Sequence, residues 1–112
     1  MIELPYKKIY RIIKYRTLSG EYLPGQKLPS LRAIAKEMGC NPATVHHAFS
    51  CLQQQGLIIS QKTVGYFITA DKDKIIELRM NEIKLMISNL YKSLCALGYS
   101  DLEIYKLIQE KC

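Results

Sequence analysis

The sequence predicts a mainly α-helical chain with one small β-hairpin. Three observations support this fold class. Apolar residues recur at helical spacing in several segments, capping residues and glycines separate these segments, and two short β-prone runs follow the third segment. The chain has 112 residues, of which 48% are hydrophobic, so it can form a small core.

The first predicted helix begins at Pro5 and runs to Leu18. Proline suits an early helical position, and Gly20 follows the helix as a stop signal. The apolar positions at helical spacing are Ile9, Ile12 and Ile13. Residues 21–25 contain proline and glycine, so we expect a turn-bearing connection there.

Two further helices should form a tight helix-turn-helix unit. Ser30 can cap the first of these helices and Gly39 can end it, while Asn41 can cap the second, which ends at Gly56. Their apolar positions are Leu31, Ile34, Ala35 and Met38 in the first, and Val45, Ala48, Phe49 and Leu52 in the second. Only residues 39–41 separate the two helices, as in helix-turn-helix motifs.

A hairpin is predicted after these helices. Residues 57–60 and 66–69 have the composition of strands, and the link over 61–65 is short enough for a hairpin. Three helices followed by a hairpin make a winged helix-turn-helix. We assign this domain to residues 1–69.

Residues 70–112 show a different pattern, with an unbroken heptad seam across 22 residues, or ~32 Å of helix, ended by Gly98. The seam consists of Ile76, Met80, Ile83, Ile87, Leu90, Leu94 and Leu97. Further apolar residues, including Ile75 and Leu78, widen the stripe, so this helix should contact more than one neighbour.

A last helix should follow, because Ser100 and Glu103 match a capping box. Its apolar residues are Leu102, Tyr105 and Ile108. Two helices of about 40 residues form little core alone, so we interpret 70–112 as a two-helix C-terminal dimerisation segment of a homodimer. The alternative is a segment folded back on its own winged domain.

The net charge of +6 belongs entirely to the first part of the chain. Residues 1–69 carry nine basic and three acidic side chains, whereas residues 70–112 carry seven of each. A basic module joined to a neutral one favours a polyanion, such as double-stranded DNA, as the partner. A solvated basic face without a partner would have the same composition.

Several classes of function lack support. No apolar run approaches the ~20 residues of a membrane span and no leader opens the chain, so we expect a cytoplasmic protein without membrane contact. No nucleophile–base grouping or glycine-rich phosphate loop indicates an enzyme or a cofactor. Adjacent histidines on a helix point about 100° apart and chelate a metal poorly.

The cysteines form no C-x-x-C pair, and reduced thiols are the simplest interpretation. They are Cys40, Cys51, Cys95 and Cys112. Cys40 occupies a turn position where a core-filling role is expected. A redox role for any of the four stays open.

The start of the third helix is the candidate base-reading element, because a helix of this kind fits the major groove. If Val45 faces the core, a rotation of 100° per residue puts Ala43 and His47 on the opposite face. Thr44 and His46 flank them. A threonine can hydrogen-bond a base or phosphate and place its methyl group on thymine.

The preceding helix offers further contacts. Arg32 suits bidentate contact with guanine or phosphate. Ser30 and Lys36 are candidates for contacts to the DNA backbone, which position a protein without reading sequence. Tyr66 in the hairpin either lies beside the DNA or packs inward.

Three runs of this chain resemble the GntR family of bacterial transcription regulators. They are residues 19–35 (SGEYLPGQKLPSLRAIA), residues 38–45 (MGCNPATV) and residues 55–58 (QGLI). Their combined order is highly specific and covers most of 5–69. The short two-helix tail is similar to that of the YtrA-type subgroup, which lacks a large effector domain and dimerises through the tail.

The resemblance implies a dimer that binds an operator and represses transcription. In the family, the arginine of the Pro-Ser-x-Arg motif contacts DNA, and this residue corresponds to Arg32. The start of the recognition helix does likewise, which here comprises Asn41, Ala43, Thr44 and His46. The wing tip also approaches DNA, where Lys62 and Thr63 fall.

Two departures from the family pattern affect these expectations. The wing has one charge and a threonine at the tip glycine position, whereas relatives often have a basic, glycine-rich wing. His46 stands where relatives often have arginine. The operator sequence therefore cannot be transferred from a relative. The residues themselves do not identify the target genes or distinguish a repressor from an activator.

The competing interpretation is a winged-helix module for protein assembly without specific DNA binding, which a salt-insensitive protein partner would favour. The short tail also leaves little room for the ~300–1,000 Å³ pocket of a small-molecule effector. An effector site between protomers and the absence of any effector both stay open.

Overall fold

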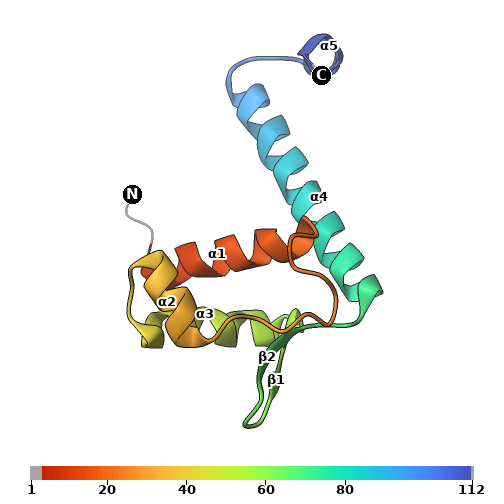
Figure 1. Ribbon diagram of the computed structural model, residues 1–112. Coiled ribbons are helices and arrows are strands. Elements are labelled where there is room, and N and C mark those ends of the chain that lie inside the picture. Colours follow the sequence, from red (N-terminus) through yellow and green to blue (C-terminus); the bar gives the residue numbers. More distant parts are fainter. Residues whose placement is uncertain (1–3, 112) are drawn as a thin grey trace. The chain divides into compact units, whose positions relative to one another are not determined.

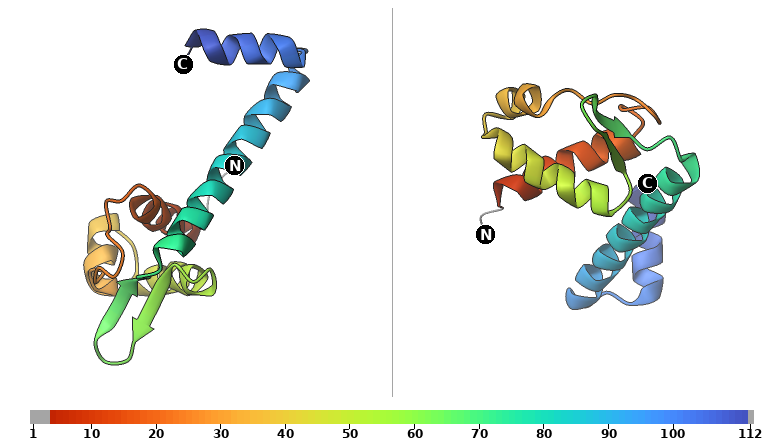
Figure 2. Two further views of the ribbon diagram at one scale, coloured as in Figure 1. Left: turned by 90° about the vertical axis from the view of Figure 1, so that its right-hand side faces the viewer. Right: turned by 90° about the horizontal axis from the view of Figure 1, so that it is seen from below.

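The computed structural model describes residues 4–111, which contain five helices and one two-stranded antiparallel sheet (Figures 1 and 2). The elements are α1 (Pro5–Leu18), α2 (Leu31–Met38), α3 (Pro42–Gln54), β1 (Ile58–Gln61), β2 (Gly65–Ile68), α4 (Lys72–Ala96) and α5 (Asp101–Lys111). The predicted fold class and element order are confirmed. The chain divides into two compact units, Met1–Leu78 and Arg79–Cys112.

The core of the first unit forms around α3, whose apolar stripe lies against α1 and α2. Val45, Ala48, Phe49 and Leu52 are all fully buried, as predicted. Ile9 and Ile13 of α1 and Ile34 of α2 belong to the same cluster. This packing fixes the rotation of α3 and leaves its other face on the surface.

The predicted caps set the helix boundaries. The Ser30 hydroxyl accepts a hydrogen bond from the Ala33 N–H at 3.0 Å, and the Asn41 side chain accepts one from the Ala43 N–H at 2.9 Å. Gly39 ends α2 with φ of 67°, a left-handed conformation that glycine adopts readily. The α2–α3 turn is therefore defined by local sequence.

Both strands differ by one residue from the predicted ranges 57–60 and 66–69. β1 begins at Ile58 because the Leu57 N–H donates to the Leu52 carbonyl at 3.1 Å, at the end of α3. β2 begins at Gly65, which pairs with Gln61. The hairpin link is thus shorter than the sequence indicated.

The connection between α1 and α2 also pairs with the wing, a feature that the sequence did not indicate. The Leu28 N–H donates to the Tyr66 carbonyl, and the Ile68 N–H donates to the Gln26 carbonyl, both at 2.8 Å. These bonds hold the entrance to α2 beside β2.

Among the described cations of the first unit, Arg16 and Lys14 are engaged within the fold. Arg16 donates to Glu37 of α2 at 2.8 Å and to the Tyr22 hydroxyl at 3.2 Å, and these bonds raise the pKa of Arg16 above its ordinary value. Lys14 is 8% exposed and donates to the Tyr10 hydroxyl at 3.3 Å. The charge facing solvent is therefore less positive than the composition of residues 1–69 indicated.

The beginning of α4 contributes to the first unit. Ile75 is buried in the core cluster and Leu78 packs against it, so these two residues face a different neighbour from the seam. Most seam residues are exposed, and Leu94 is half-buried. No helix within residues 4–111 has the length and apolar character needed to cross a membrane.

In the second unit, the predicted capping box is confirmed. Ser100 and Glu103 exchange backbone-to-side-chain hydrogen bonds at 3.2 and 3.3 Å. The Tyr91 hydroxyl donates to the Asp101 carboxylate at 2.6 Å, and this bond raises the pKa of Tyr91 to about 12. These contacts define the turn between α4 and α5.

Helix α5 contains a buried apolar residue that the sequence did not single out. Ile104 is buried, whereas the apolar residues named for this helix are exposed: Leu102, Tyr105 and Ile108. The helix carries apolar residues on two faces, and spacing alone does not show which of them the same chain covers.

Phe49→Ala should lower the free energy of unfolding by ~3–5 kcal/mol, because Phe49 is fully buried at the centre of the core. Ile59→Ala is the control, since Ile59 is 47% exposed, and it should change stability by less than ~0.5 kcal/mol. Urea denaturation at equal protein concentration measures both. Equal losses would contradict the assigned core.

Candidate nucleic-acid interface

The start of α3 presents the predicted base-reading residues at the surface. Asn41, Ala43 and His46 are exposed and Thr44 is half-buried, while Val45 faces the core. Burial of the α3 stripe thus leaves the first turns of the helix available to a partner. A helix end with small and hydrogen-bonding side chains is suited to the major groove.

His47 is also exposed, but a residue of α1 holds its ring. The Tyr6 and His47 rings stack with centroids 3.8 Å apart and planes 18° apart. The two rings border a shallow hollow of about 300 Å³. Its lining residues are Leu4, Pro5, Tyr6, Ala43, Thr44 and His47. Sequence reasoning missed Tyr6, because no local pattern links it to a residue in α3.

The predicted residues of α2 form a second group. Arg32 and Lys36 are exposed and lie one helical turn apart, so they share a face. Glu37 belongs to the contact with Arg16 instead. The Ser30 hydroxyl is exposed although it caps α2, which leaves its second lone pair accessible to a donor.

The wing tip carries the remaining predicted residues. Lys62 and Thr63 are exposed in a turn closed by the Val64 N–H, which donates to the Gln61 carbonyl at 3.0 Å. Thr63 has φ of 66°, in the left-handed region that disfavours a β-branched side chain. The turn therefore has a backbone conformation that favours glycine, although the residue at this position is threonine.

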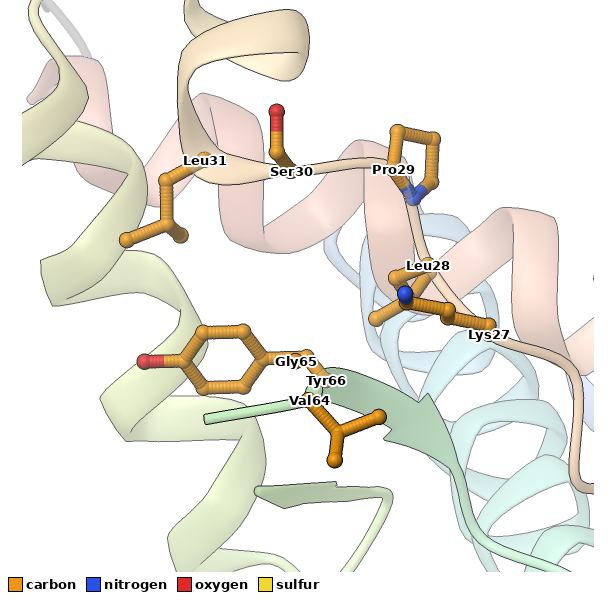
Figure 3. A pocket seen from close by; sticks show the side chains of 8 residues that line it. All are labelled: Lys27, Leu28, Pro29, Ser30, Leu31, Val64, Gly65 and Tyr66. Atoms are coloured by element: carbon orange, nitrogen blue, oxygen red, sulfur yellow. The ribbon is translucent and has the colours of Figure 1, made fainter. Parts of the chain in front are cut away.

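A groove of about 430 Å³ separates the entrance of α2 from the wing (Figure 3). Leu31 and Tyr66 both point toward α3 across it, whereas the Ser30 hydroxyl points away from Tyr66. The Tyr66 ring meets Phe49 edge-on, with centroids 4.9 Å apart, so it packs inward. Among the described residues that line this groove, Lys27 supplies the only charged side chain.

Within residues 4–111, no three His, Cys, Asp or Glu side chains gather closely enough to hold a metal ion. Cys40 is half-buried against the core, which confirms its predicted filling role, and Cys51 and Cys95 are also free thiols. Cys112 lies outside the described residues.

Comparisons with known proteins give consistent results. A family model described as bacterial regulatory proteins, gntR family, matches residues 5–68. The chain is similar to the HTH-type transcriptional repressor YtrA of Bacillus subtilis, with 32% identity over 103 residues, which cover 91% of this chain and 77% of YtrA.

Two solved structures are also similar. A GntR family transcriptional regulator from Listeria monocytogenes has a TM-score of 0.91 and 27% identity, covering 96% of this chain and 95% of that chain. The AraR DNA-binding domain in complex with an operator has a TM-score of 0.60 and 26% identity, covering 62% of this chain and 83% of that one.

Thr63→Gly should raise the free energy of unfolding, by up to about 1.5 kcal/mol. Removing left-handed strain gains about 1–2 kcal/mol, while the flexibility of glycine costs about 0.5–1 kcal/mol. Lys62→Gly is the matched control. It should lower the free energy of unfolding, because Thr63 is the one non-glycine residue with positive φ among residues 4–111, and glycine at Lys62 therefore relieves no left-handed strain. A loss of stability in Thr63→Gly, measured by urea denaturation, would contradict the assigned turn.

Proposed function

The chain belongs to the GntR family of bacterial regulatory proteins, which are transcription regulators and not enzymes, and we propose that it is a homodimeric repressor of transcription. In this proposal, residues 1–69 bind an operator and 70–112 dimerise. One observation carries this proposal. Helix α3 has a fully buried stripe on one face, and its start presents exposed residues on the other face, beside α2, which carries the exposed Arg32. The repressor name of YtrA and the operator complex of AraR support it.

Each part of the interface has a distinct task in this proposal. Ala43, Thr44 and His46 approach base edges in the major groove, and Arg32 makes a bidentate contact with guanine or phosphate. The DNA backbone is contacted by Ser30, Lys36, Lys62 and Thr63. Occupancy of promoter DNA then blocks transcription.

The exposed seam supports dimerisation. Ile83 and Ile87 are 39% and 61% exposed, and Leu97 is 73% exposed. A contiguous apolar stripe of this length is costly in water and typical of a surface that a partner covers. A second copy of the same stripe gives a two-fold dimer, and two-fold symmetry requires a pseudo-palindromic operator.

Arg32→Ala should weaken operator binding roughly 5- to 150-fold, the equivalent of ~1–3 kcal/mol for a lost bidentate contact. The dimer should persist, because Arg32 lies in α2 and outside the seam. The matched control is Lys106→Ala, which removes an exposed cation from α5 and should change affinity less than about twofold. Fluorescence anisotropy measures affinity and light scattering measures mass. Unchanged affinity of Arg32→Ala would refute this site.

Ile83→Glu/Ile87→Glu should produce monomers with weakened operator binding, because two charges would enter an apolar interface. Asn81→Glu/Asn89→Glu adds the same charge at exposed positions outside the seam, and it should remain a dimer. Sedimentation equilibrium measures both masses. A stable monomer in the unmodified protein would refute the seam as the dimer interface.

A further inference from the structure

The hollow between the starts of α1 and α3 lies within the surface proposed to read bases. Three of its lining residues come from α3, namely Ala43, Thr44 and His47, and the others come from residues 4–6. The lining atoms are mainly carbon, in a region where the neighbouring exposed side chains are polar or basic. Such a hollow favours a small apolar group over a charged one.

The Tyr6–His47 stack gives this hollow a fixed wall. A histidine at an exposed helix position normally samples several rotamers, and that freedom is lost on binding at a cost in affinity. Here the ring centroids are 3.8 Å apart and the planes are nearly parallel, so the stack holds the His47 ring before any ligand arrives. Residues outside the helix-turn-helix therefore shape the recognition surface.

Charge near the hollow favours DNA as the occupant over an apolar peptide. Lys7 and Lys8 are exposed in the first turn of α1, directly after Tyr6. Among residues 4–111, the side chains that line the hollow include no acidic one. A hollow with an apolar lining, at the start of a helix that also carries exposed cations, matches a base edge that is bordered by phosphates.

Thymine is the base that fits this environment. It alone presents a methyl group in the major groove, and small apolar side chains and threonine methyl groups are suited to contact it. An amino group of cytosine or adenine at the same place would lose its hydrogen bonds to water.

The geometry points to a thymine-specificity pocket in which Tyr6 and His47 wall off one thymine methyl group in each operator half-site. This inference rests on the proposed function and adds a named base and a residue, Tyr6, outside the helix-turn-helix.

The test uses the full-length protein and the duplex that it selects from a random-sequence pool. Each thymine in the half-sites is replaced in turn by deoxyuridine, which removes only the methyl group. At one thymine per half-site, the replacement should weaken binding about fourfold, the equivalent of about 0.8 kcal/mol for one buried methyl group. The same replacement in Tyr6→Ala or His47→Ala should change affinity less than about twofold.

Tyr15→Ala is the matched control, because Tyr15 is an exposed tyrosine of α1 outside the hollow. It should retain the fourfold effect of deoxyuridine. His47→Ala serves as a second variant. Because His47 is exposed, its truncation tests the pocket independently of how well Tyr6→Ala folds.

The outcomes separate this inference from the proposed function. Selection of no sequence at all overturns both. A selected operator that binds tightly but contains no thymine, or none sensitive to deoxyuridine, overturns the inference alone. An equal deoxyuridine effect in the wild type, Tyr6→Ala and His47→Ala also overturns it, because the methyl group would then lie elsewhere.

Discussion

Burial of the α3 stripe against α1 and α2 determines how the helices of the first unit are placed. With Val45, Ala48 and Phe49 fully buried, α3 cannot rotate without exposing a large apolar area. The side of its first turns that carries Ala43 and His46 must therefore face outward. The same packing brings the start of α1 to α3, where Tyr6 stacks on His47. One packing arrangement thus provides both the core and the shape of the candidate interface.

The electrostatic character of the first unit follows from this packing as well. Arg16 joins α1 to α2 through Glu37, so part of the positive charge stabilises the fold. The exposed cations of α2 and the wing, including Arg32 and Lys62, remain to face a polyanion. Charge composition therefore indicated the class of partner, and the structure distinguishes structural cations from those that a partner can reach.

Features with local causes could be predicted from the sequence. Ser30 and Asn41 cap their helices through bonds to residues two or three positions away, and the periodicity of α3 identified its core face. Features with distant causes could not. The pairing of Leu28 with Tyr66 and the stacking of Tyr6 on His47 join residues far apart in the chain. Similarly, α5 has two apolar faces, and only tertiary packing selects Ile104.

In the proposed dimer, two copies of α3 read one operator and the exposed seam holds the copies together. This arrangement can be tested by selecting bound duplexes from a random-sequence pool and sequencing them. A two-fold dimer should enrich a pseudo-palindrome with half-site centres about 10–10.5 base pairs apart, or a multiple of that spacing. Enrichment of a single unrepeated half-site, or of no sequence, would contradict it.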